Sequence, residues 1–328
     1  MRVLVTGATG FTGSCLARHL VGVGDEVCAL VRPVSERRAG RLLDDGIQLA
    51  FGDLGDPQSL SSACRGIEVV YHVAATYRTA GHSAATYREV NVEGTRRLLD
   101  AAEAAGVRRV VHCSTAGVHG HIEHPPATED APLAPGDIYQ VTKLEGERIA
   151  RVRGEESGLE VVVVRPIGIY GPGDTRFLKL FRGIARRRFP MFGNGSVFYH
   201  LTYIEDLVRG FRLSGTVPAS AGRTYLLAGP RYTTLRELVN LIAVELNVNP
   251  PHLSLPVWPI WLAGALCELV CVPLRLEPPL YRRRVEFYTK SRAFDPVRAR
   301  DELGFRPQVD LQEGIHRTAE WYRDQGML

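Results

Sequence analysis

Seven residues near the N-terminus constrain the fold more than any other part of the chain. The apolar segment 3–6 leads into Gly7-Ala8-Thr9-Gly10-Phe11-Thr12-Gly13, and a helical pattern follows over 12–21. In a strand–turn–helix unit, the first glycine of G-x-x-G-x-x-G permits a tight turn, the second lets backbone approach a pyrophosphate, and the third allows close helix packing. Unpaired amides at the helix start attract the phosphates. The spacing predicts a dinucleotide-binding turn, with contacts from Gly7, Thr9, Gly10, Phe11, Thr12 and Gly13.

The first half of the chain alternates short apolar runs with helical patterns. The expected strands are 3–6, 26–31, 47–51, 69–73, 109–113 and 160–165. The expected helices between them include 12–21, 57–64, 84–105 and 139–156. Helices that separate buried apolar strands imply parallel pairing with right-handed crossovers. We therefore predict an α/β fold with a doubly wound parallel Rossmann sheet.

The second half has more prolines and isolated helical patterns. Strands are expected only near 198–203 and 224–226, and helices at 205–214, 235–246, 258–272, 296–303 and 311–324. A chain of 328 residues exceeds the usual size of one core, so two lobes are expected. We predict an NAD(P)-binding domain over 1–165, to which part of 196–228 returns. Residues 166–195 and 229–328 should form a smaller, mostly helical substrate-binding lobe.

The end of the second strand indicates which nicotinamide cofactor is bound. An acidic residue there would bind the ribose hydroxyls of NAD, whereas an arginine accommodates the extra phosphate of NADP. The chain has Arg32 at this place, and Arg37 and Arg38 follow. We therefore favour NADP(H), with NAD(H) as the alternative. Asp53 and Leu54 follow the third strand, where they are expected to contact the cofactor, with Asp53 at the adenine.

The pattern Tyr139-Gln140-Val141-Thr142-Lys143 places a tyrosine and a lysine one helical turn apart on one face. The ordinary pKa of tyrosine, about 10, is too high for acid–base work at neutral pH. A nearby ammonium and the positive nicotinamide favour the phenolate and lower that pKa. The fifth strand ends at Ser114 and Thr115, whose hydroxyls lie at the edge where ligands bind to such sheets. Together with the glycine turn, these residues predict one active site.

The chain resembles the extended short-chain dehydrogenases, the NAD-dependent epimerase/dehydratase family, over almost its whole length. The resemblance rests on the motifs GATGFTG (7–13), GDLGD (52–56), HVAA (72–75), NVEGT (91–95), CSTAGVHG (113–120), YQVTK (139–143), RPIGIYGPGD (165–174), GNG (193–195), HLTYIEDLV (200–208) and RARDELGFRP (298–307). It implies an enzyme that transfers hydride at a secondary alcohol or ketone carbon.

The same resemblance implies a role for particular residues. Tyr139 would be the acid–base, with Lys143 as its activator and ribose anchor. The active-site hydroxyl falls on Thr115, with Ser114 as the weaker candidate, and Asn91 matches a supporting asparagine. Further cofactor contacts are expected from Val73, Ala74, Ala75, Pro166, Ile167 and Ile169.

Two subfamilies compete for the substrate. The 3β-hydroxysteroid and 4-carboxysterol dehydrogenases carry a motif like residues 165–174 and a late apolar segment like 253–276. The nucleotide-sugar epimerases, dehydratases and reductases have a loop like 189–195, but their usual asparagine is replaced by Gly168. The arginine they usually carry a few residues after this loop is also absent. We favour the apolar 3β-hydroxysteroid or 3-oxo substrate. A catalytically silent cofactor-binding protein is less favoured, since such members lose the tyrosine or lysine.

The amino-acid composition limits the binding partners and the cellular compartment that we expect for this protein. The net charge of +4 is small, so we expect no nucleic acid. The basic run 182–188 fits a solvated helix face, or else an anion contact. The six cysteines are scattered, which favours reduced thiols, no metal site and a cytoplasmic enzyme. Segment 253–276 should form a core helix of the smaller lobe, or else a lid or a peripheral membrane contact. A homodimer is expected, as is common in the superfamily.

Overall fold

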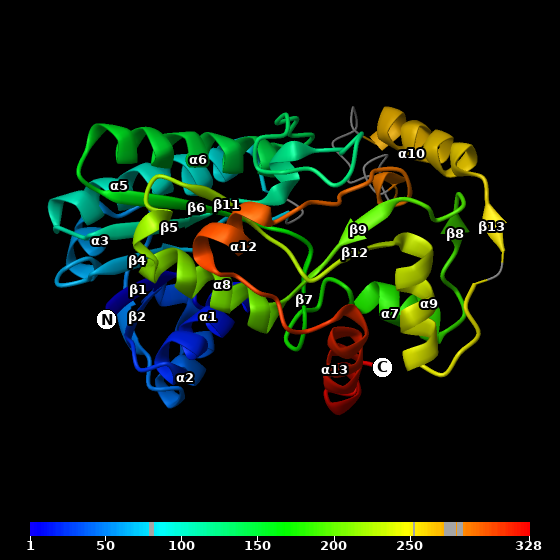
Figure 1. Cartoon of the computed structure of the whole chain (residues 1–328), viewed down its shortest axis with the longest axis horizontal. Coiled ribbons are helices and arrows are strands. Elements are labelled where there is room, and N and C mark those ends of the chain that lie inside the picture. Colours follow the sequence, from blue (N-terminus) through cyan, green and yellow to red (C-terminus); the bar gives the residue numbers. More distant parts are fainter. Residues whose placement is uncertain (79–81, 252, 272–279, 281–284) are drawn as a thin grey trace.

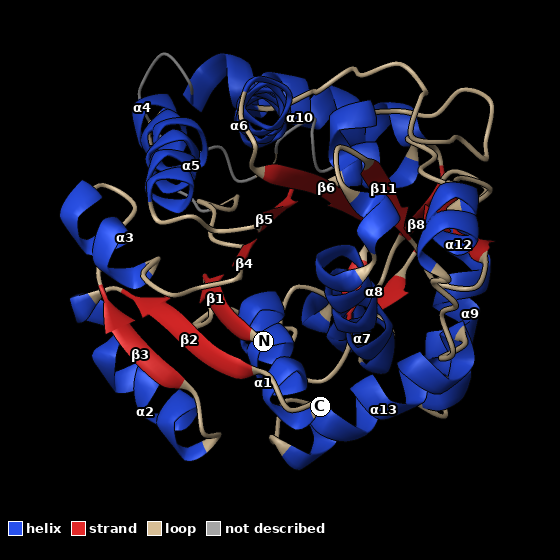
Figure 2. Cartoon of the chain, turned by 60° about the vertical axis from the view of Figure 1, so that its left-hand side comes forward, coloured by secondary structure: helices blue, strands red, loops and turns tan. Residues whose placement is uncertain are grey.

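The computed structural model describes residues 1–78, 82–251, 253–271, 280 and 285–328, with the backbone alone at 36–38. It contains one seven-stranded sheet whose strands are all parallel (Figure 2). From one edge to the other they are β11 (Thr224–Leu227), β6 (Glu160–Pro166), β5 (Arg109–Cys113), β4 (Val69–His72), β1 (Arg2–Thr6), β2 (Glu26–Val31) and β3 (Gln48–Phe51). The predicted doubly wound α/β fold is confirmed.

Alternate residues of each central strand pack into different layers of helices. In β1, Val3 and Val5 belong to one apolar cluster and Leu4 to the other. The first cluster is completed by α1 (Phe11–Gly22), α2 (Glu36–Asp44), α8 (Ile204–Thr216) and α12 (Val297–Leu303). The second is completed by α3 (Pro57–Ala63), α5 (Gly94–Ala104) and α6 (Ile138–Glu156). Burial on both faces explains why the strands are almost uniformly apolar.

A smaller lobe lies beyond the β11 end of the sheet (Figure 1). Its core is formed by α7 (Leu178–Ala185), α9 (Leu235–Glu245) and α13 (Leu311–Asp324). Three two-stranded ribbons join it: β7 (Ile169–Tyr170) with β10 (Thr202–Tyr203), β8 (Met191–Phe192) with β13 (Ser254–Leu255), and β9 (Phe198–His200) with β12 (Tyr232–Thr234). Because β11 and α8 pack on the large sheet, the chain returns to it after 195. The predicted domain boundaries themselves stay a prediction.

Several elements differ from the sequence-based expectation. The predicted helix 84–105 is helical from 84 to 104, but it consists of α4 (Ala84–Arg88), a π-helical turn η2 (Glu89–Glu93) and α5. The predicted strand 198–203 is two short strands, because β9 pairs with β12 whereas β10 pairs with β7. Helix α2, the first part of α7 and the two-residue strands β7, β8 and β13 were not predicted, since strands this short show no period. The short helices η1 (Pro33–Ser35), η3 (Ala116–His119), η4 (Pro218–Ser220) and η5 (Glu286–Tyr288) complete the described elements.

Helix α10 (Val257–Cys271) stands apart from the apolar clusters (Figure 1). Its predicted last residue, Val272, and the rest of segment 253–276 beyond it lie outside the described residues. Trp258 is 68% exposed and Leu269 is 70% exposed, so this helix is not a core element over the described part. No described helix combines the length and the apolar character needed to cross a bilayer.

A buried arginine ties the sheet to the end of α8. The Arg109 guanidinium, 1% exposed, donates to the carbonyls of Ser214 at 3.2 Å and Val217 at 2.7 Å and pairs with Glu160 at 2.7 Å. We predict that Arg109→Ala lowers the free energy of unfolding by about 3 kcal/mol, because it removes a buried ion pair, several hydrogen bonds of the guanidinium and the volume of a fully buried side chain. Chemical denaturation measures this loss.

The neighbouring residue supplies the matched control. Arg108 pairs with the same Glu160 at 3.1 Å but is 44% exposed. Arg108→Ala should cost less than about 1 kcal/mol. If both variants lost the same free energy of unfolding, Arg109 would not be the residue that ties the sheet to the end of α8.

Candidate active site

The turn after β1 leaves no room for side chains at two of its glycines. Gly7 has φ +75°, and a Cβ there would lie 2.8 Å from the backbone of Ala74. A Cβ at Gly13 would lie 2.3 Å from the carbonyl oxygen of Gly7. Helix α1 starts after Gly10 with no side-chain cap and no acidic residue in its first turn. Its first amides therefore remain available to an anion, so the turn fits a pyrophosphate.

The end of β4 is fixed beside this turn by a buried hydrogen-bond chain. The Thr6 hydroxyl oxygen accepts from the Ala74 amide at 3.1 Å and contacts His72 Nδ1 at 2.9 Å. His72 Nε2 lies 3.0 Å from the Thr95 hydroxyl. Burial lowers the pKa of His72 to about 3, so this histidine is neutral at physiological pH. Val73, Ala74 and Ala75, which are predicted to contact the cofactor, come directly after β4, the strand that pairs with β1.

The other predicted adenosine-side residues lie at adjacent strand ends. Strand β2 pairs in register with β3, and the Gly52 amide donates to the Val31 carbonyl at 3.0 Å, so Arg32 and Asp53 end neighbouring strands. Both side chains are exposed, whereas Leu54 is buried. The side chains of Arg37 and Arg38 lie outside the described residues. The site thus places one arginine and one aspartate where the adenosine end of a dinucleotide would lie.

Helix α6 presents the Y-x-x-x-K pair to the same edge of the sheet. Asp137 caps the helix by accepting from the Gln140 amide at 2.9 Å. Tyr139 is 9% exposed and Lys143 is 1% exposed. Burial lowers the pKa of Lys143, and Cys113 acts in the opposite direction. Cys113 also interacts with Tyr139, so the end of β5 lies against both residues of the pair.

The environment of Tyr139 holds the phenol in its protonated form. Burial raises its pKa, and Cys113 and Tyr77 act in the same direction. Arg78 and Arg176 oppose the shift. The guanidinium of Arg78 lies 5.4 Å from the centre of the Tyr139 ring. Two cations from outside the predicted motif therefore contribute to the electrostatics of the tyrosine.

Asn91 lies in the π-helical turn η2, which contacts α6. Its amide donates to the Thr142 hydroxyl at 3.0 Å and to the Thr76 carbonyl at 3.2 Å, and its side-chain oxygen accepts from the Thr76 amide at 2.8 Å. Helical turns of this type are frequent at functional sites. Asn91 therefore joins the segment after β4 to the turn of α6 that separates Tyr139 from Lys143.

The two hydroxyl candidates after β5 have different surroundings. Ser114 is 2% exposed and donates to the Glu147 carboxylate at 2.6 Å. Thr115 is half-buried, and its hydroxyl accepts from the Gly117 amide at 3.1 Å. A hydroxyl that already donates to a buried carboxylate cannot donate to a substrate at the same time. The geometry therefore favours Thr115 as the hydroxyl that meets the substrate.

The last predicted contacts lie after β6. Pro166 and Ile167 are buried, and Ile167 packs in an apolar cluster with Ala116 and Phe294. Ile169 is half-buried, and its carbonyl accepts from Arg176 at 2.8 Å. These residues lie at the carboxyl end of the sheet, but Ile167 faces the apolar cluster rather than solvent.

An aromatic and cationic cluster that the sequence did not predict bridges the glycine turn and Tyr139. The Arg176 guanidinium lies 5.5 Å from the Phe11 ring and 5.7 Å from the Tyr77 ring. The Tyr77 ring lies 5.0 Å from that of Tyr139 in an edge-on arrangement. Arg78 pairs with Asp137, the cap of α6, at 2.7 Å. No local pattern signals these contacts, because they join segments far apart in the chain.

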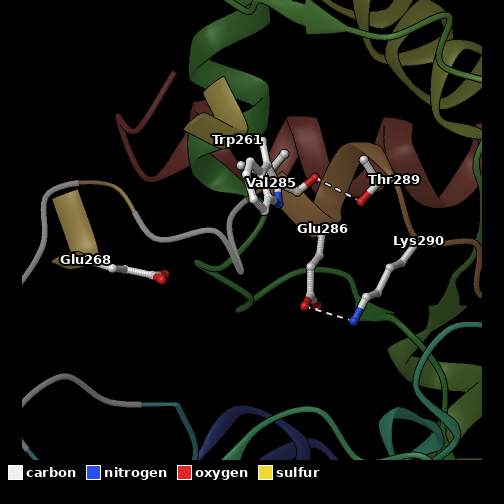
Figure 3. A pocket seen from close by; sticks show the side chains of 6 residues that line it. All are labelled: Trp261, Glu268, Val285, Glu286, Thr289 and Lys290. Carbon is white, nitrogen blue, oxygen red and sulfur yellow. Dashed lines mark hydrogen bonds and ion pairs between the residues drawn. The ribbon is translucent and has the colours of Figure 1, made fainter. Parts of the chain in front are cut away.

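A pocket of about 400 Å³ lies between α10 and the segment that includes η5 (Figure 3). It is lined by Trp261, Glu268, Val285, Glu286, Thr289 and Lys290. Glu286 and Lys290 form an ion pair at 2.8 Å. The Lys290 ammonium is 3.8 Å from the place a Cβ of Gly136 would take, three residues before Tyr139. One lining residue, Lys290, thus lies close to the loop that precedes α6, and the lining combines an indole with charged groups.

Comparison with known proteins assigns the family. Residues 3–228 match the model of the NAD dependent epimerase/dehydratase family. The chain belongs to this family. The assignment confirms the resemblance seen in the sequence, and this family's fold is the one observed.

Three relatives of this family member span different reactions. It is 32% identical to the 2-alkyl-3-oxoalkanoate reductase of Stenotrophomonas maltophilia, over 97% of this chain and 98% of that protein. It is 31% identical to isoform 1 of the 3beta-hydroxysteroid-dehydrogenase/decarboxylase of Arabidopsis thaliana, over 97% and 78%. The structure of a double mutant of the dTDP-glucose 4,6-dehydratase DesIV of Streptomyces venezuelae, with NAD bound, matches with a TM-score of 0.79, 28% identity and full coverage of both chains.

The family comprises NAD-dependent epimerases and dehydratases, and the three relatives are named as a reductase, a dehydrogenase/decarboxylase and a dehydratase. The chain is an enzyme of this extended short-chain type. The residues that would hold the nicotinamide dinucleotide are those of the glycine turn, the ends of β2 to β4, Tyr139 and Lys143. When bound, the cofactor accepts or supplies the hydride.

The glycine turn gives a direct test of cofactor binding. We predict that Gly13→Ala weakens binding of the dinucleotide at least about 10-fold and costs about 1–3 kcal/mol of stability, because its Cβ would overlap the Gly7 carbonyl. Isothermal titration calorimetry and thermal unfolding measure the two effects. Gly22→Ala, at the end of the same helix with nothing within 4 Å of its Cβ, is the control. If the Gly13→Ala variant bound the dinucleotide as tightly as the control, the glycine turn would not be the binding site for the pyrophosphate.

Proposed function

We propose that the enzyme transfers hydride between NADP(H) and a secondary alcohol or ketone carbon of an apolar 3β-hydroxysteroid or 3-oxo substrate. The observation that carries the proposal is the pairing of buried Tyr139 and Lys143 on α6, beside a glycine turn that fits a pyrophosphate. In the reductive direction the neutral Tyr139 phenol gives its proton to the substrate oxygen. In the oxidative direction the phenolate takes the hydroxyl proton.

The surrounding residues position the reacting groups. The Thr115 hydroxyl donates to the substrate oxygen, which Tyr139 approaches from α6. Lys143 holds the ribose of the cofactor with its ammonium. Asn91 fastens the intervening turn of α6 through Thr142, at 3.0 Å. The buried surroundings of Tyr139 exclude water from the proton that is transferred.

The proposed substrate class is supported by the backbone at Gly168. This residue has φ +29°, and a Cβ there would lie 2.5 Å from the carbonyl oxygen of His200. The nucleotide-sugar enzymes usually carry an asparagine at this position. The backbone at Gly168 has no room for the Cβ of an asparagine. Exposed Trp258 and Trp261 on α10 add apolar surface beside the pocket. The names of the reductase and the steroid dehydrogenase among the relatives agree with a 3-oxo or 3-hydroxy substrate.

The second candidate is a nucleotide-sugar epimerase, dehydratase or reductase. It is favoured by the match to the dTDP-glucose 4,6-dehydratase over the whole chain. We also propose that the enzyme is a homodimer in the cytoplasm. A peripheral membrane contact through segment 253–276 stays a prediction.

Nicotinamide absorbance distinguishes the two candidates. The purified enzyme is mixed with NADP⁺ or NAD⁺ and either a 3β-hydroxysteroid or a 3-hydroxy fatty acid. We expect reduced cofactor to accumulate, and Tyr139→Phe to lower kcat about 10²–10⁴-fold through loss of the acid–base. Conversion of a UDP- or dTDP-sugar, with no turnover of either apolar alcohol, would overturn the proposed substrate class.

The proposed cofactor preference depends on Arg32 at the tip of β2. We predict that Arg32→Ala raises KM for NADP⁺ at least about 10-fold and changes KM for NAD⁺ less than about 2-fold, because only NADP⁺ carries the 2′-phosphate. Steady-state kinetics with each cofactor measure the ratio. Arg18→Ala, an exposed arginine on α1 that pairs with Asp45 at 3.5 Å, is the control. Equal effects of Arg32→Ala on both cofactors would refute the preference.

A further inference from the structure

A buried ion pair lies directly behind the catalytic helix. Glu147 of α6 and Arg165 of β6 are 1% and 3% exposed, and Arg165 Nη2 lies 2.5 Å from Glu147 Oε1. Arg165 Nε donates to Glu147 Oε2 at 3.1 Å. The third arginine nitrogen, Nη1, lies 3.0 Å from His119 Nε2 and donates to the Glu129 carbonyl at 3.0 Å. With several hydrogen bonds made on each side, the carboxylate is held in one orientation.

This carboxylate has a second partner on the active-site side. Ser114, at the end of β5, donates to Glu147 Oε2 at 2.6 Å. Thr115, the proposed substrate hydroxyl, is the next residue. Glu147 therefore links the strand end that carries the hydroxyl to the helix that carries Tyr139.

Glu147 also lies one helical turn beyond Lys143 on the buried face of α6. The other titratable groups that interact with Lys143 come from the sheet: His72 of β4, and His112 and Cys113 of β5. Burial lowers the pKa of both histidines and raises the pKa of the Cys113 thiol to about 11, so all three are neutral at physiological pH. In the described part of the chain, Glu147 is thus the carboxylate that acts on Lys143.

We propose that Glu147, held by Arg165, is a positioning residue that aligns the Thr115 hydroxyl with helix α6 and keeps Lys143 in its ammonium form for the cofactor ribose. The proposal rests on the roles given above to Thr115 and Lys143. A merely structural ion pair would stabilise the fold without affecting the protonation of Lys143.

The charge role is tested by cofactor binding, which needs no substrate. The dissociation constants of NADPH and NADH are measured by fluorescence between pH 6 and 10 for the wild type, Glu147→Gln and Glu147→Asp. Loss of the Lys143 proton should weaken binding, and Glu147→Gln should move the midpoint to lower pH by about one unit or more, since it removes the anion that favours the ammonium. Glu147→Asp keeps the charge and should restore the midpoint.

Glu129→Gln is the matched control. Glu129 is a buried carboxylate whose carbonyl also accepts from Arg165, but its side chain accepts from the Leu226 amide at 2.9 Å instead of facing Lys143. It should leave the midpoint unchanged. An unshifted midpoint in folded Glu147→Gln, or an equal shift in Glu129→Gln, would overturn the charge role.

The alignment role is tested by Ser114→Ala, which breaks the 2.6 Å bond without leaving a buried charge unpaired. We expect kcat to fall at least about 10-fold, while the cofactor dissociation constant and its pH midpoint stay unchanged. An unchanged kcat would overturn this role, and Ser114→Ala still tests the alignment if Glu147→Gln does not fold. A shifted midpoint in an enzyme that turns over neither substrate class would support Glu147 and refute the proposed function instead.

Discussion

The close approach of helix α1 to strand β1 is the contact on which the rest of the site depends. It is possible only because Gly13 carries no side chain: a Cβ there would lie 2.3 Å from the Gly7 carbonyl. The same turn packs against the backbone of Ala74 after β4. Two strand ends and one helix start therefore meet at a single point. Its amides and its shape suit the pyrophosphate of a dinucleotide.

The order of the strands then gathers the remaining groups. From β1 the chain adds β2 and β3 on one side of the sheet and then crosses back to add β4, β5 and β6 on the other side. The switch point therefore lies between β1 and β4, and both of these parallel strands end at the same edge. On one side of the switch point, Asn91 follows β4, and Thr115 and Tyr139 follow β5. On the other side, Arg32 and Asp53 follow β2 and β3. Proton handling and recognition of the adenosine end are thus separated by the geometry of the sheet.

Burial sets the electrostatics of the site. It raises the pKa of Tyr139 and lowers that of Lys143, so both shifts favour the uncharged forms. The charged groups that act against these shifts are contributed by separate elements: Arg78 after β4 and Arg176 after β7 act on the tyrosine, and Glu147 acts on the lysine. Each of these three has its own partner, namely Asp137, Asp174 and Arg165. Charges near the reacting groups are therefore paired and held in place.

The sequence by itself determined the sheet, the glycine turn and the Y-x-x-x-K pair, because each follows from local periodicity and short spacing. It also contained a signal for Glu147, four residues after Lys143. Only the tertiary structure decided that Ser114 donates to Glu147 while Thr115 remains available, since the two hydroxyls are adjacent in the chain. It alone revealed Arg78 and Arg176 beside Tyr139. Their contacts join residues that are distant in sequence, and no local pattern encodes the packing that brings them together.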